Sequence, residues 1–98
     1  MHIGFNFNGT LVGPGSATPL PGVIQRLDEL PASARLFITM NEVGMLRQAR
    51  RDLGRLPSLY IGGRGFDQRA AADANVRFLH VDTWRHQGLA GVPNVSTW

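Results

Sequence analysis

Two asparagines, Asn6 and Asn8, stand where a short apolar segment near the N-terminus ends, and a Gly9-Thr10 pair follows them. An amide side chain donates and accepts hydrogen bonds, but it is neutral, a poor nucleophile and unable to release and recover a proton as a carboxyl group does. It is also a weaker ligand than a carboxylate for a hard divalent cation. The pair therefore favours binding over acid–base chemistry. Asn8-Gly9 by itself is also typical of a tight turn.

Other candidate residues follow later apolar segments. Thr39 ends the segment that starts at Arg35, Gly63 follows Ser58–Ile61, and Asp82 ends Val76–Asp82. In parallel sheets, ligand sites form beyond the carboxyl ends of the strands. We therefore expect the residues that end strands to supply any site.

The elements that must position these residues alternate along the chain. Apolar, partly β-branched segments predict strands, and apolar residues at helical spacing predict helices between them. This alternation predicts an α/β, Rossmann-like three-layer sandwich with a mostly parallel sheet of four to five strands, forming one domain over residues 1–98. The predicted strands cover 2–7, 35–40, 58–61, 76–82 and 94–98, and the predicted helices cover 21–30, 41–53 and 66–74.

Composition narrows the functional classes. The chain has 98 residues, is 43% hydrophobic and has no cysteine, which excludes disulfides, thiolate metal sites and cysteine nucleophiles. No apolar run suits a membrane helix and no signal peptide is evident, so we expect a cytoplasmic protein without membrane contact. All ten basic residues are arginine. Four of them, Arg47, Arg50, Arg51 and Arg55, predict a solvated helix face or a patch for an acidic partner, and without interleaved aromatics nucleic acid is not favoured.

The segment Asn6-Phe7-Asn8-Gly9-Thr10-Leu11, at the end of an apolar strand, resembles the first motif of the haloacid-dehalogenase (HAD) superfamily, Asp-x-Asp-Gly-Thr-Leu/Val. Two further features are similar to the second-motif region of that family. Pro21-Gly22-Val23 opens a helix, and the next apolar strand ends in Thr39. The resemblance implies a HAD-like domain without a cap, because the stretch between the first motif and Pro21 is too short for one.

The family's chemistry is implied position by position. Asn6 would stand at the nucleophile, Asn8 at the general acid/base and Thr39 at the second motif. The resemblance also implies a phosphate site and a magnesium site, but with amides in place of both aspartates we expect no metal or weak Mg²⁺ at most. The implied phosphate contacts are Gly9, Thr10, Thr39, Arg64 and Arg69, and the implied metal positions are Asn6, Asn8 and one fourth-motif acid.

The fourth motif has two possible placements, and in either one the motif should flank Asn6. The preferred placement puts Asp82 at the end of the fourth strand, with Thr83 where a second acid is common, because it gives a complete five-stranded core. The alternative overlays Gly62–Asp67 on the family's Gly-Asp-x-x-x-Asp. It places Gly63 at a metal ligand and leaves Asp67 as the surviving acid.

Together these features predict a catalytically inactive phosphatase-like domain that binds a phosphate-bearing ligand or a protein partner. One alternative is a magnesium-dependent phosphomonoester hydrolase of the same superfamily, inactivated by aspartate-to-asparagine changes. Another is a structural or interaction domain, including a possible homodimer formed through an exposed sheet edge at the third or fifth strand.

Overall fold

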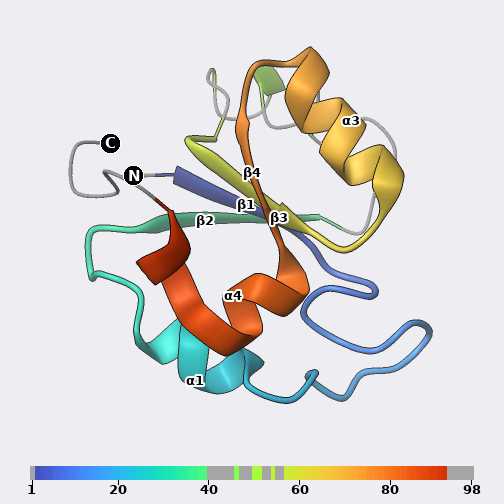
Figure 1. Ribbon diagram of the computed structural model, residues 1–98, viewed down its shortest axis with the longest axis vertical. Coiled ribbons are helices and arrows are strands. Elements are labelled where there is room, and N and C mark those ends of the chain that lie inside the picture. The colour runs from blue at the N-terminus through green and yellow to red at the C-terminus, as the bar shows by residue number, and fades with distance from the viewer. Residues whose placement is uncertain (1, 40–45, 47–49, 52–53, 55–56, 93–98) are drawn as a thin grey trace.

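The computed structural model describes residues 2–39, 46, 50–51, 54 and 57–92. A sheet of four parallel strands forms its centre, in the order β2-β1-β3-β4 (Figure 1). The strands are β1 (His2–Asn6), β2 (Arg35–Thr39), β3 (Leu59–Gly62) and β4 (Arg77–His80). The predicted α/β class with a parallel sheet is confirmed.

Helices cover both faces of this sheet. The described helices are α1 (Val23–Asp28), α3 (Gly65–Asp73) and α4 (Val81–Gln87), and a short 3-10 helix, η1 (Gly88–Gly91), continues from α4. Figure 1 shows α1 and α4 together on one side of the sheet and α3 on the other. None of the helices within the described residues is both long and apolar enough to cross a bilayer.

Alternation along the strands builds two apolar layers. Ile3 and Phe5 of β1 face α1 and α4, where Trp84 packs against Phe5 with their ring centroids 5.1 Å apart. Tyr60 of β3 faces the opposite layer with Ala71 of α3 and with Leu46. All four residues of β3 are buried, as expected for an interior strand of a parallel sheet covered on both faces.

Two features differ from the sequence-based expectations. The predicted strand 76–82 ends at His80, and Val81 begins a helix where the apolar pattern predicts a continued strand. The side chain of His80 accepts a hydrogen bond from the Asp82 backbone N–H, which caps this helix. The predicted strand 94–98 and most of the predicted helix 41–53 lie outside the described residues.

Candidate functional site

The carboxyl end of β1 lies in the interior of the sheet and is closed from solvent. Asn6 is fully buried, and its backbone pairs in register with Thr39 of β2. The backbones of these two residues therefore lie side by side at the ends of neighbouring strands. Asn8 follows in a half-buried position, where it forms an isolated bridge with Val12.

A buried carboxylate, Asp67, accounts for the closed state of this strand end. The Asn6 side-chain N–H donates to Asp67 Oδ1 at 3.4 Å, and the Tyr60 hydroxyl donates to the same oxygen at 2.7 Å. The Arg64 backbone N–H donates to Asp67 Oδ2 at 3.1 Å. Asp67 thereby joins β1, β3 and the start of α3 through three hydrogen bonds. Both carboxylate oxygens already accept, which is what a buried charge requires.

The preferred placement of the fourth motif, at Asp82, follows a strand that does not pair with β1. β3 pairs with β1, whereas β4, which precedes Asp82, is an outer strand next to β3. Asp82 lies in the first turn of α4, where it is exposed and forms an ion pair with Arg85 at 3.1 Å. Asp67, the alternative, is the acid that contacts Asn6.

Gly63 lies beside the first motif in this arrangement. A Cβ atom at Gly63 would lie 3.1 Å from the Gly9 carbonyl oxygen and 3.2 Å from Val81 Cγ1. There is thus little room for a larger side chain where the alternative placement puts a metal ligand. The position that would hold an acid is packed against the turn instead.

The backbone amides of the turn after β1 donate hydrogen bonds within the turn itself. The Gly9 N–H donates to the Val12 carbonyl at 2.8 Å, and the Thr10 N–H donates to the Phe7 carbonyl at 3.4 Å. Both amides that were predicted to hold phosphate therefore donate hydrogen bonds within the turn. The Thr10 hydroxyl is buried and has no hydrogen-bond partner within the described part of the chain.

Two arginines were predicted as phosphate contacts, and the structure separates them. The Arg64 guanidinium lies over the turn, since a Cβ at Gly9 would be 3.8 Å from its Nη2 atom, and it also lies 5.7 Å from the centre of the Phe66 ring. Arg64 is half-buried, whereas Arg69 is on the exposed surface of α3. The rim of this site consists of Asn8, Gly9 and Arg64.

The donor set does not fit a magnesium ion. Within the described ranges, no three His, Cys, Asp or Glu residues are grouped so that they could hold a metal. The carboxylate nearest Asn6 is Asp67, and hydrogen bonds occupy both of its oxygens. Asn6 Oδ1 is buried without a partner, but a neutral amide oxygen alone is a poor site for a hard divalent cation.

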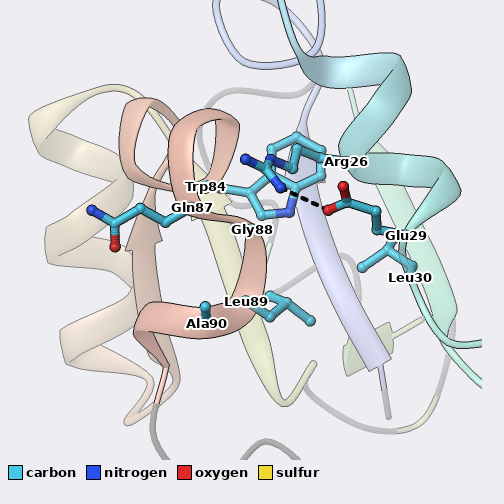
Figure 2. A pocket seen from close by; sticks show the side chains of 8 residues that line it. All are labelled: Arg26, Glu29, Leu30, Trp84, Gln87, Gly88, Leu89 and Ala90. Atoms are coloured by element: carbon cyan, nitrogen blue, oxygen red, sulfur yellow. Dashed lines mark hydrogen bonds and ion pairs between the residues drawn. The ribbon is translucent and has the colours of Figure 1, made fainter.

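A pocket of about 210 Å³ lies between α1 and α4–η1, and none of the first-motif residues lines it (Figure 2). Arg26 of α1 spans its wall. Its Nε donates to the Arg85 carbonyl at 3.0 Å, its Nη2 to the His86 carbonyl at 2.6 Å, and its Nη1 to Glu29 at 2.7 Å. Arg26 thus holds α1 to carbonyls in the last turn of α4. The buried indole N–H of Trp84 has no partner among the residues described.

We expect Arg26→Met to destabilise the fold by about 1.5–3 kcal/mol, because hydrogen bonds from a charged donor to the end of α4 are lost. Glu29→Gln is the matched control and should cost much less, since it keeps an acceptor at an exposed site.

The hydrogen bond from Arg26 lowers the pKa of Glu29. The small contribution of this pair is therefore present above the usual pKa of the carboxyl and is lost as the pH falls through the lowered one. Urea unfolding of the variants at neutral and acid pH measures both effects, and equal losses for the two variants would contradict this role of Arg26.

No family model, no curated protein and no solved structure matched the chain in three comparisons.

Proposed function

We propose that the chain is a catalytically silent HAD-like phosphatase domain that binds a phosphate-bearing ligand at the rim formed by Asn8, Gly9 and Arg64. One observation carries the proposal. At the position of the family's nucleophile, a fully buried asparagine donates its amide N–H to the remaining carboxylate. β3 pairs with β1, and Asp67 contacts Asn6, as the alternative placement of the fourth motif expects. This agreement supports the HAD-like assignment.

This arrangement opposes turnover for two reasons. Attack on phosphorus requires an exposed, electron-rich oxygen, and the Asn6 side chain is both neutral and buried. General acid–base work requires a group that can exchange a proton, and Asn8 cannot do so. Asp67 does not replace either group, because its two oxygens accept hydrogen bonds from Asn6, Tyr60 and Arg64.

The rim can nevertheless bind an anion. A guanidinium offers several N–H donors in one plane and matches the oxygens of a phosphate. Arg64 holds such a group over the Gly9 turn, and the residue before this glycine in the chain, Asn8, has a neutral side chain. With amides at positions 6 and 8 and glycine at 63, three acids expected in an active member are replaced by neutral residues. A phosphate at this rim would therefore meet less negative charge than in an active site.

Titration of the chain with inorganic phosphate and with phenyl phosphate tests the proposal. We expect binding that magnesium does not strengthen, and we expect no release of phosphate from the ester. Arg64→Gln should weaken the affinity by about ten- to a hundred-fold, the effect of losing charge-assisted hydrogen bonds. Arg69→Gln is the matched control, because it removes the same charge from the exposed surface of α3.

Isothermal titration calorimetry and backbone NMR shifts both report the result. Equal losses in the two arginine variants would show nonspecific attraction to positive charge and would contradict a site at the rim. No binding of either probe would leave a protein partner as the occupant of this surface.

A further inference from the structure

Large apolar side chains remain exposed at one border of the sheet. Leu36 and Ile38 of β2 are 45% and 46% exposed. Leu36 and Ile38 are two residues apart and pair in register with Ile3 and Phe5 of β1, so they lie on the same face of the sheet as those core residues. β2 therefore extends the apolar layer of β1 to the border of the domain.

The edge of β2 differs from that of the other outer strand. Within the described ranges β2 is an outer strand and pairs with β1 alone, and an edge of this kind is open to pairing with another strand. β4, the strand at the opposite border, has exposed Arg77 and His80 at its two ends. β2 has one charge, Arg35, at its start, followed by Leu36-Phe37-Ile38. Its central part has none of the charged residues that protect edge strands from pairing.

We propose that β2 pairs antiparallel with β2 of a second copy, around a two-fold axis at Phe37, so that one continuous eight-stranded sheet spans the dimer. This register places Leu36 of each copy opposite Ile38 of the other on one face, and Phe37 opposite its own symmetry mate. Apolar and aromatic pairs of this kind stabilise antiparallel strands. The surface is thus complementary to itself, as a closed two-fold interface requires.

The position of Arg35 favours antiparallel over parallel pairing of the two β2 strands. In the antiparallel register, Arg35 lies opposite position 39, a neutral threonine. In-register parallel pairing would set Arg35 beside Arg35, and like charges side by side are destabilising. The expectation of an exposed sheet edge at the third strand is wrong, because β3 lies between β1 and β4 and has no free edge.

The register can be tested by cross-linking, because the chain has no cysteine of its own. In the proposed dimer, Cα atoms of directly opposite residues lie about 4.5–5.5 Å apart, which suits a disulfide. Leu36→Cys and Ile38→Cys proteins should therefore cross-link to each other when mixed under oxidising conditions. Each alone should not, because identical residues are offset by two positions and lie about 8 Å apart. Self-cross-linking of either single variant, or no mixed product, would overturn the proposed pairing.

Light scattering or sedimentation over a range of concentrations gives an independent measurement. We expect concentration-dependent dimers for the unaltered chain and at least ten-fold weaker association for Ile38→Lys, because a charge would enter an apolar contact. Ile24→Lys is the matched control, since it places the same charge on another exposed isoleucine and should change association less than two-fold. Circular dichroism checks that both variants are folded. A monomer at all concentrations, or equal effects of the two lysines, would overturn the proposal.

Discussion

Replacing Asn6 with aspartate is expected to destabilise the fold by about 3 kcal/mol or more, and not to restore phosphatase activity. The amide N–H of Asn6 donates to Asp67 Oδ1, and both side chains are fully enclosed. An aspartate at this position would set two carboxylates within hydrogen-bond distance of each other, without the donor that now joins them. Two like charges this close, both away from water, strongly disfavour a state in which both carboxyls are ionised. A loss of this size is a large part of the stability of a small domain.

The Asn6→Asp loss should depend on pH. In acid the two carboxyls can share one proton and restore a hydrogen bond between them. As the pH rises and both tend to ionise, the folded variant must hold either a proton or two like charges, so its stability falls further below that of the parent chain. Chemical denaturation of both proteins between acid and neutral pH measures this divergence. A constant difference across that range would contradict a buried carboxylate pair.

Two further variants separate this effect from general damage. Asn8→Asp introduces the same chemical change two residues along, at a half-buried position, and should cost much less. Asn6→Asp combined with Asp67→Asn exchanges donor and acceptor, and the Tyr60 hydroxyl can then accept from the new amide. We expect this double variant to recover at least half of the loss. Magnesium-dependent turnover by Asn6→Asp/Asn8→Asp would instead indicate an enzyme that the two asparagines had inactivated.

Local sequence signals predicted the parallel strands well. β1, β2 and β3 follow from short apolar segments whose ends are marked by glycine, proline or polar residues. The alternation of strands with helices then implied a parallel sheet, and with it the meeting of Asn6 and Thr39 at one edge. These conclusions needed only periodicity and the handedness of βαβ connections.

Long-range properties were less accessible. The sequence of β4 does not show that this strand lies at the border of the sheet, next to β3. The choice between Asp82 and Asp67 therefore depended on an assumed strand order. Helix α4 was missed because Val81 continues the apolar run of β4, while the signal that starts the helix is a histidine side chain accepting from Asp82. The occupation of the Gly9 and Thr10 amides is likewise a property of the folded turn.

Gly62→Ala should be the second strongly destabilising change, with an expected loss on the order of 3 kcal/mol. A Cβ at Gly62 would lie 2.7 Å from Asp67 Oδ2 and 2.8 Å from Asp67 Cγ, which is far inside van der Waals contact. The Asp67 side chain cannot move aside easily, because three hydrogen bonds hold it in a buried position. The methyl group must therefore either displace the carboxylate from its donors or push α3 away from β3.

Gly65→Ala is the matched control for this prediction. It adds the same methyl group three residues later, at the first position of α3, where nothing lies within 4 Å of the new atom. Because alanine favours helix over glycine, we expect no loss and a gain of up to about 1 kcal/mol. Thermal unfolding followed by circular dichroism compares the two variants. A Gly62→Ala protein as stable as Gly65→Ala would contradict the packing of Asp67 against the end of β3.

A double variant identifies the cause of the Gly62→Ala loss. If the loss comes from the clash with the Asp67 side chain, then Asp67→Ala should remove the obstacle, and Gly62→Ala should cost little in that background. If the two losses simply add, the methyl group must act elsewhere in the fold. Tyr60 gives a local signal of the same event, because it is the single tyrosine of the chain and its hydroxyl donates to Asp67. Its near-ultraviolet absorbance should change in Gly62→Ala and in Asp67→Ala, and stay as it is in Gly65→Ala.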